Sequence, residues 1–219
     1  MMSNISDTVY EKHSGLDHYD GKMIRIVDRW EQSFTGTAIH FNRDYMFHEY
    51  GWEEEGILIN GCIVRAGDII DIEERPGLSI LRADQLWQRA GAYYVRIQAM
   101  AKKHHITLRQ EFDEHDGSET RYIVVTDQDF PIATARMYPL DQKRMMIGRV
   151  VVLPEYRHQG IGTMVVSECE VWAEDLHYEK TVVDSRENKV AFYEQMGYEV
   201  CDEAVKGETF RCIRMEKDL

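Results

Sequence analysis

One short stretch limits the fold of this chain more than any other: a valine run, a turn, and a helix that opens with two glycines. It reads Val150-Val-Val-Leu-Pro-Glu-Tyr-Arg157-His-Gln-Gly160-Ile-Gly162-Thr163. The first four N–H groups of a helix lack partners inside the helix and lie at the positive end of its dipole. Glycines there let phosphate oxygens approach the main chain, and Arg157 adds a charged, fork-shaped donor. The stretch therefore predicts a diphosphate cradle between a strand and a helix.

Two common phosphate-binding motifs do not match this cradle. The P-loop spacing Gly-x4-Gly-Lys-Ser/Thr is absent from the sequence. The dinucleotide fingerprint Gly-x-Gly-x-x-Gly would begin at Gly160, but its sixth position is Val165 and several elements precede it. What remains is the pattern Arg-x-x-Gly-x-Gly, from Arg157 to Gly162.

Strand and helix patterns alternate after Pro76. We predict strands at Leu78–Leu81, Arg121–Thr126, Ile132–Tyr138, Met145–Leu153, Thr181–Asp184, Tyr198–Ala204 and Thr209–Met215. We predict helices from an Asp84 N-cap to about Lys103, from Gly160 onward, and over Glu187–Met196, because apolar residues recur there every three or four positions. The pattern therefore predicts that residues 76–219 form one domain that combines strands and helices.

The first 75 residues have a different sequence pattern, in which short β-type runs are separated by turn residues. The runs are Met23–Asp28, Phe34–Phe41, Tyr45–Tyr50, Gly56–Ile59 and Ile69–Ile72. Asn60-Gly61 predicts a tight hairpin, because both central residues must accept positive φ. Five short strands cannot bury both faces of an open sheet, so residues 1–75 are predicted to form a small all-β barrel.

Charge limits the partners of both segments. The chain carries a net charge of −13, and residues 1–75 alone hold 15 acidic and 7 basic residues, a net of −8. Such a surface repels phosphate backbones, so we expect no nucleic-acid partner, and basic peptides or cationic small molecules are favoured. We expect residues 1–75 to serve docking or dimerisation, which leaves a homodimer open, and peptide binding is the alternative.

No run approaches the roughly 18 apolar residues of a membrane helix, and the start lacks a basic stretch followed by an apolar one. The four cysteines form neither metal-type pairs nor a dense disulfide framework. We therefore expect a cytoplasmic protein with no membrane partner. His104, His105 and His115 lack a metal-ligand spacing, so no metal site is predicted.

Three motifs together resemble the GNAT superfamily of N-acetyltransferases. Arg157-x-x-Gly-x-Gly resembles its coenzyme A signature, and Asn188-Lys-Val-Ala-Phe-Tyr193-Glu-Gln-Met-Gly197-Tyr198 resembles its second signature. Glu111-Phe-Asp113-Glu-His-Asp116, after Tyr94-Val-Arg-Ile-Gln, is similar to the acidic box of the ElaA-like branch. The resemblance covers about residues 76–219 and implies the α+β GNAT fold, a mixed and mostly antiparallel sheet flanked by helices.

The resemblance implies direct transfer of an acetyl group from acetyl-CoA to a primary amine of a small molecule or a peptide, without a metal. In GNATs a main-chain N–H on the bulged fourth strand stabilises the thioester oxygen, which points to Val150, Val151 and Val152. The same strand edge pairs with the pantetheine arm. The diphosphate contacts implied for this chain are Arg157, His158, Gln159, Gly160, Ile161, Gly162 and Thr163.

The resemblance also implies roles for single side chains. Tyr193 would reprotonate the leaving thiolate, since the pKa of an unperturbed phenol, about 10, is not far above that of a thiol. The alternative is that Tyr193 is a core tyrosine. Asn188 would bond the pantetheine arm; the alternative is a helix cap. We expect an N-acetyltransferase, and the alternative is a non-catalytic acyl-CoA-binding or regulatory module with a protein-interacting barrel.

The acidic box is the candidate for the amine side of the reaction. Glu111 is the candidate base, and Asp113 and Asp116 are candidate substrate contacts, because clustered carboxylates should raise one another's pKa and attract an ammonium group. A solvated loop is the alternative. Arg149 would anchor a substrate carboxylate or pair with this cluster.

Overall fold

The computed structural model describes residues 15–206 and 211–219. The chain divides into two compact units. The first consists of the residues up to Ser79 with the short segments Asp127–Asp129 and Tyr156–Met164, and the second holds the rest. Thr209, where we predicted the last strand to begin, lies outside the described residues.

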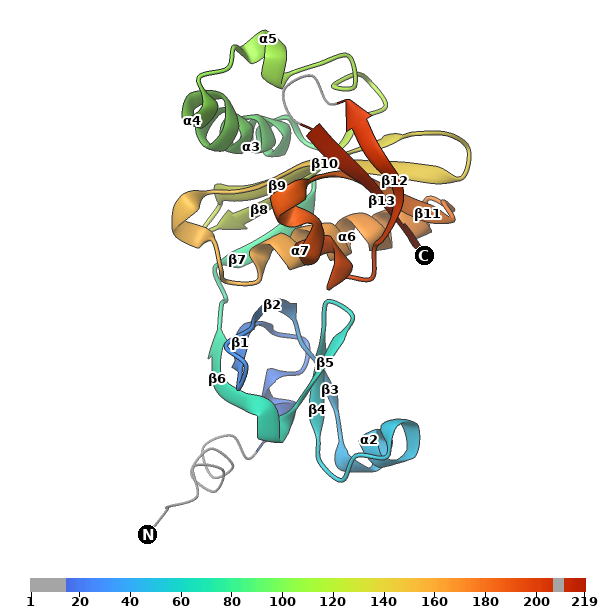
Figure 1. The fold of residues 1–219 in the computed structure, drawn as a ribbon. Helices are drawn as coiled ribbons and strands as arrows, with labels where there is room; N and C mark the ends of the chain where they lie inside the picture. The colour runs from blue at the N-terminus through green and yellow to red at the C-terminus, as the bar shows by residue number, and fades with distance from the viewer. Residues whose placement is uncertain (1–14, 207–210) are drawn as a thin grey trace. The chain divides into compact units, whose positions relative to one another are not determined.

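The first unit is built from two three-stranded sheets. One has the order β2-β1-β6 and the other β3-β4-β5 (Figure 1). Their strands are β1 (Met23–Asp28), β2 (Ser33–Thr37), β3 (Ile39–Phe41), β4 (Gly56–Ile59), β5 (Cys62–Arg65) and β6 (Ile69–Glu74). The helical elements are η1 (Leu16–Tyr19), α2 (Arg43–Tyr50) and η2 (Ala66–Asp68).

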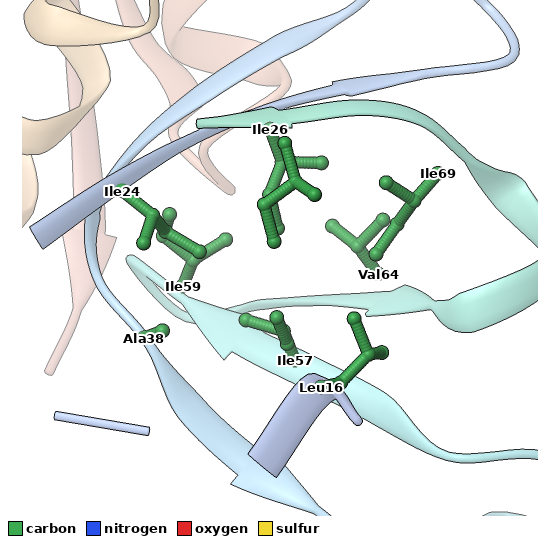
Figure 2. Packing of buried hydrophobic residues seen from close by; sticks show 9 residues of the cluster. Leu16, Ile24, Ile26, Ala38, Ile57, Ile59, Val64 and Ile69 are labelled. Carbon is green, nitrogen blue, oxygen red and sulfur yellow. The ribbon is translucent and has the colours of Figure 1, made fainter. Parts of the chain in front are cut away.

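A single apolar cluster fills the space between these two sheets. Figure 2 shows Ile24 and Ile26 of β1 facing Ile57 and Ile59 of β4, with Leu16 of η1 beside them. Residues alternate between buried and half-buried along β1, as a strand with one face on a core requires. Truncating one of these fully buried isoleucines to alanine should cost about 2–5 kcal/mol.

Part of the N-terminal prediction is confirmed. β1 and β4 have the predicted bounds, and Asn60-Gly61 forms the β4–β5 turn with φ of 50° and 77°. The predicted strand Phe34–Phe41 is two strands, separated at Ala38. The predicted closed barrel is not confirmed, because the described strands form two separate sheets.

The predicted strand Tyr45–Tyr50 is wrong, since this segment lies in helix α2. The aromatic residues favour a strand by propensity. However, the Asn42 side chain accepts a hydrogen bond from the Tyr45 N–H, and Gly51 ends the helix with φ of 71°. These two caps satisfy the helix termini and outweigh the weak strand propensity.

The second unit is a seven-stranded sheet in the order β12-β13-β11-β10-β9-β8-β7 (Figure 1). The strands are β7 (Leu78–Arg82), β8 (Arg121–Asp127), β9 (Phe130–Pro139), β10 (Arg144–Val152), β11 (Lys180–Arg186), β12 (Glu199–Lys206) and β13 (Arg211–Asp218). β10 and β11 are parallel, whereas β9–β10, β11–β13 and β12–β13 are antiparallel. The predicted mixed sheet is thereby confirmed.

Helices cover both faces of this sheet. In Figure 1, α3 (Leu86–Arg96) lies over one face, and α6 (Ile161–Asp175) and α7 (Val190–Glu194) lie over the other. α3 continues through a π-helical segment, Ile97–Ala101, into α4 (Lys102–His104). The remaining helical elements are α5 (Leu108–Glu111), η4 (Pro154–Tyr156) and η5 (Glu187–Lys189).

Two details of α3 differ from the sequence-based expectation. The N-cap is Gln85 rather than Asp84, and the Gln88 side chain accepts the Gln85 N–H at 2.8 Å. Gly91 has a packing role, because a Cβ there would lie 3.1 Å from Pro131 Cβ, so its absence lets the helix approach the sheet. Within the described residues, no helix is long and apolar enough to cross a membrane.

Candidate active site

β10 carries a bulge in its middle. Its register with β9 places Gly148 opposite Arg136 and Val151 opposite Thr134. Arg149 and Val150 therefore oppose a single residue of β9, and Arg149 has φ of 50°. A side-chain-bearing residue in this left-handed region costs about 1–3 kcal/mol, so the surrounding structure must hold it there.

The parallel pairing of β10 with β11 ends where the bulge begins. The last paired residues are Ile147 and Val183, whereas β10 runs on to Val152. β11 continues to Arg186, with β13 as its partner. The two strands thus part just before the bulge, and β10 continues toward Val152 without β11 as its neighbour.

The predicted diphosphate cradle follows β10 directly along the chain. Arg157, His158, Gln159 and Gly160 form the loop after η4, and Ile161, Gly162 and Thr163 open α6. His158 has φ of 61° and Gly160 has φ of 77°. Only Gly adopts this conformation without a steric penalty, so Gly160 is the residue that the turn into the helix requires.

Tyr193 and Asn188 lie near the start of the second family signature, on α7 and η5. Tyr193 is 9% exposed, and its ring packs edge-on against Tyr198 with centroids 5.5 Å apart. Burial, and to a lesser extent the neighbouring Cys169, raises the pKa of Tyr193 well above its ordinary value. The expectation of an unperturbed phenol is therefore wrong. Asn188 is exposed on η5, which leaves its amide accessible.

A carboxylate–arginine cluster occupies the sequence that we predicted as the acidic box. We use this name for Glu111, Asp113, Asp116, Arg96, Arg136 and Arg149. Arg96 is fully buried, and its Nε donates to Glu111 Oε1 at 2.7 Å. Its Nη1 donates to Asp116 Oδ1 at 2.5 Å, and Tyr122 Oη donates to the same oxygen at 2.6 Å.

The other side of the cluster joins β9 and β10 to the loop after α5. Arg136 Nη1 donates to Asp113 Oδ1 at 2.5 Å and to Asp116 Oδ2 at 2.7 Å. Arg149 Nη2 donates to Asp113 Oδ2 at 2.9 Å, and Arg149 Nε lies 3.4 Å from Glu111 Oε1. Three carboxylates thus face three guanidinium groups, and the solvated-loop alternative does not describe them.

These pairings reverse the expected direction of the pKa shifts. Burial alone would raise the pKa of Asp113, but the hydrogen bond from Arg136 and the charges of Arg136 and Arg149 lower it overall. Burial likewise opposes the shift of Asp116, yet hydrogen bonds from Arg96 and Tyr122 hold its pKa well below the ordinary value. Our expectation that the carboxylates raise one another's pKa is wrong for Asp113 and Asp116.

Sequence reasoning missed two members of the cluster, Arg96 and Arg136. Arg96 interrupts the apolar face of a helix, and Arg136 lies in the strand run Ala133–Met137, whose other members are apolar or Thr. Buried arginines need carboxylate partners because an unpaired buried charge is very costly. Two arginines at buried positions and one acidic loop could therefore have predicted that the arginines pair with the carboxylates of that loop.

Two further side chains with reactive groups, His115 and Cys169, pack against other parts of the chain. His115 stacks on Tyr138 with ring centroids 4.2 Å apart and an angle of 7° between the planes. Among residues 15–206 and 211–219, no group of three or more His, Cys, Asp or Glu is placed to hold a metal ion. Cys169 is fully buried, and burial with the charge of Glu170 raises its thiol pKa well above the ordinary value, which disfavours a nucleophilic thiolate.

A mixed sheet whose bulged strand parts from its parallel neighbour, followed by a glycine-bearing loop and a helix, defines a GNAT-type acyltransferase fold. The comparison with protein families agrees. The model of the acetyltransferase (GNAT) family matches residues 83–198, and the chain belongs to this family.

Individual relatives give the same result. The uncharacterized N-acetyltransferase YjcF of Bacillus subtilis (strain 168) is 28% identical over 116 residues, which cover 53% of this chain and 81% of YjcF. A Lactobacillus plantarum protein assigned as an N-acetyltransferase superposes with a TM-score of 0.62 at 28% identity, over 65% of this chain and 99% of its own. Escherichia coli ElaA superposes with a TM-score of 0.55 at 19% identity, over 64% of this chain and 98% of ElaA. This last likeness shows the fold alone, so the ElaA-like branch stays a prediction.

Proposed function

We propose that this protein transfers an acetyl group from acetyl-CoA directly to a primary amine. The observation that carries the proposal is the parting of β10 and β11 after Ile147 and Val183, at the bulge of β10. An extended ligand with amide groups can pair with a strand edge of this kind as an added strand would. The pantetheine arm has this chemistry, and acetyl-CoA supplies an acyl group activated as a thioester.

Main-chain groups of the chain would bind both ends of this co-substrate. Val150–Val152 would hold the pantetheine amides. Leu153 N–H donates to Ile132 O of β9, so the alternation of an antiparallel pair also turns the Val151 N–H toward β9. The N–H that would face the oxygen gaining negative charge during attack is therefore one on the side of the bulge away from β9. The main-chain N–H groups from His158 to Thr163, with the Arg157 side chain, would bind the diphosphate. The chemistry of these donors fits the ligand, because all of them are neutral or cationic and the diphosphate is anionic.

Tyr193 is the proposed proton donor to the departing sulfur. No hydrogen bond to its hydroxyl is formed by the residues that the structure describes, so the proton is available to a ligand. The raised pKa of Tyr193 makes the phenol a weaker acid than expected but keeps it protonated through neutral and mildly alkaline pH. Asn188 is the proposed partner of the pantetheine arm.

The acceptor amine must be neutral when it attacks. Glu111 remains the proposed base, and Asp113, Asp116 and Arg149 remain proposed contacts of the amine side. Since three guanidinium groups balance the three carboxylates, we infer that the cluster shapes the site more than it attracts an ammonium group. Glu111→Gln tests the base directly, because the amide cannot accept the proton of the amine, so kcat should fall while coenzyme A affinity is kept.

The deciding experiment incubates the purified full-length protein with acetyl-CoA and a panel of amines, and measures free thiol. The panel contains polyamines, amino sugars, amino acids, and peptides with a free N-terminus or an internal lysine. Thiol release that requires one amine class supports the proposal and names the acceptor. Coenzyme A binding without turnover on any amine would favour the non-catalytic acyl-CoA-binding module, and failure to bind coenzyme A would overturn both.

A further inference from the structure

The helix α2 of the first unit contributes little to the core of that unit. It connects β3 to β4, and of its eight residues only Met46 is buried. The Met46 side chain reaches Gly56 of β4, where a Cβ would lie 2.7 Å from its terminal methyl. α2 is therefore a well-capped helix that one side chain anchors to the sheet, and the rest of its surface is free of the core.

This helix displays aromatic side chains to solvent. Tyr45, Phe47 and Tyr50 are 43%, 52% and 43% exposed. Two of them continue into a row of rings, Phe41–Tyr45–Tyr50–Trp52, with centroid separations of 4.5, 6.4 and 5.5 Å. Large exposed aromatic side chains that adjoin one another on a helix without core contacts are typical of an interaction site.

A shallow hollow adjoins these rings. It has a volume of about 280 Å³ and is lined by Arg43, Asp44, Phe47, His48 and Glu53. We call the row of rings, Phe47 and this hollow the α2 surface. An apolar side chain can enter at Phe47, and polar groups surround it.

The charge around the α2 surface decides what can bind there. Residues 42–55 contain five carboxylates and one arginine, and Asp44, Glu49 and Glu53 are exposed. Carboxylates beside aromatic faces favour cations, because the ring faces also attract positive charge. The same carboxylates repel nucleic acid, an anionic membrane and a second copy of this surface.

We propose that the α2 surface docks a basic polypeptide segment of a partner protein, with arginine or lysine side chains separated by apolar ones. The cations lie over the exposed rings Tyr45 and Tyr50 and beside Glu49 and Glu53, since Arg65 already lies over Trp52 at 5.3 Å. An apolar side chain packs on Phe47. The docking is separate from acetyl transfer, so it stands or fails independently of the proposed function.

The test uses the full-length protein and a fluorescent, N-terminally blocked peptide of repeated Arg-Leu-Arg-Gly units. This probe has no primary amine and cannot be an acetyl acceptor. We expect saturable binding in fluorescence anisotropy at physiological ionic strength, and none of the matched Glu-Leu-Glu-Gly peptide. Absence of binding by the basic peptide at millimolar concentration would overturn the proposal.

Variants separate the α2 surface from the general negative charge of the chain. The double variant Phe47→Ser/Tyr50→Ser keeps every charge and should weaken binding about tenfold or more. Trp30→Ser, a matched control that removes a 63%-exposed aromatic elsewhere in the first unit, should change it less than about twofold. The proposal is contradicted if both variants weaken peptide binding equally, or if neither variant weakens it.

Charge reversal provides the second arm. Glu49→Lys/Glu53→Lys should abolish binding of the basic peptide, since like charges then face each other. If a variant has a changed melting temperature, its binding result is set aside. The unaltered protein is then titrated with the basic peptide, and its backbone amide shifts are followed by NMR. Shifts confined to residues 41–53 on peptide addition support the proposal, and shifts elsewhere without them refute it.

Discussion

Arg149 Nη2 donates a hydrogen bond to Asp113 Oδ2 over 2.9 Å, which ties the bulge of β10 to the loop that follows α5. Arg149 is the residue with positive φ in that bulge. Its guanidinium also lies within 3.4 Å of the Glu111 main-chain oxygen. The pairing thus holds a strained backbone in place at the point where the proposed oxyanion donor is needed.

We therefore expect Arg149→Ala to lower kcat about tenfold or more, equivalent to about 1.4 kcal/mol, with a much smaller change in coenzyme A affinity. Without the pair, the backbone can leave the left-handed region, and the main-chain N–H that the bulge presents turns away. Arg149→Lys should restore part of the rate. Arg144→Ala, which removes an exposed pair with Asp141 on the same strand, is the control and should leave kcat unchanged. An equal loss of kcat in Arg149→Ala and Arg144→Ala would mean that the Arg149 side chain does not hold the bulge for catalysis.

Asp116 should contribute strongly to stability. It accepts hydrogen bonds from Arg96, Arg136 and Tyr122, and its side chain is 8% exposed. Asp116→Asn leaves two buried guanidinium groups short of a partner, so unfolding free energy should fall by about 3–5 kcal/mol. Denaturant titration followed by tryptophan fluorescence measures this change. Asp141→Asn, at an exposed pair, should cost less than about 1 kcal/mol.

The same carboxylates predict how stability depends on pH. Because the pKa values of Asp113 and Asp116 are lower in the folded state than in the unfolded state, their contribution is complete above about pH 4–5. It is lost as pH falls through the folded-state values. Melting temperature should therefore drop steeply below about pH 4 in the unaltered protein and less steeply in Asp116→Asn. If melting temperature falls equally steeply with pH in both proteins, Asp116 is not the group that makes stability depend on pH.

Tyr193→Phe should lower kcat about tenfold or more while coenzyme A affinity stays nearly unchanged, since the ring is kept and only the proton donor is lost. The raised pKa adds a second expectation. The rate should rise with pH as the amine loses its proton and then level off, without an alkaline fall below about pH 10. Unchanged turnover in Tyr193→Phe would remove the phenol from the mechanism.

Gly160→Ala should weaken coenzyme A binding about tenfold or more, because alanine is strained at φ of 77° and its Cβ would lie 2.6 Å from Ser33 O and Thr35 N of β2. The turn that presents the main-chain N–H groups must then shift. Isothermal titration with coenzyme A measures this. Gly117→Ala is the control: its φ is not positive, and the nearest atom to an added Cβ is 3.9 Å away. Equal affinity in the two variants would place the diphosphate elsewhere.

The sequence alone determined the elements whose signals are local. The Asn60-Gly61 hairpin, the strands β1 and β4 and the glycine-bearing loop before α6 follow from turn chemistry and from patterns that a few neighbouring residues define. The family motifs also predicted the strand that bulges. Helix α2 was predicted wrongly although its caps, Asn42 and Gly51, are visible in the sequence, because strand propensity was weighted above them.

Only the tertiary structure decided the carboxylate–arginine cluster and the position of the bulge. Arg96, Arg136 and Arg149 come from a helix and two strands that the sheet register brings to one acidic loop. Whether a carboxylate has a raised or lowered pKa depends on which charge lies within a few ångströms, and for Asp113 one such charge, Arg149, is 36 positions away along the chain. Local patterns can indicate that a buried arginine needs a carboxylate partner, but they do not show which carboxylate it meets, since register is set by the packing of the whole sheet.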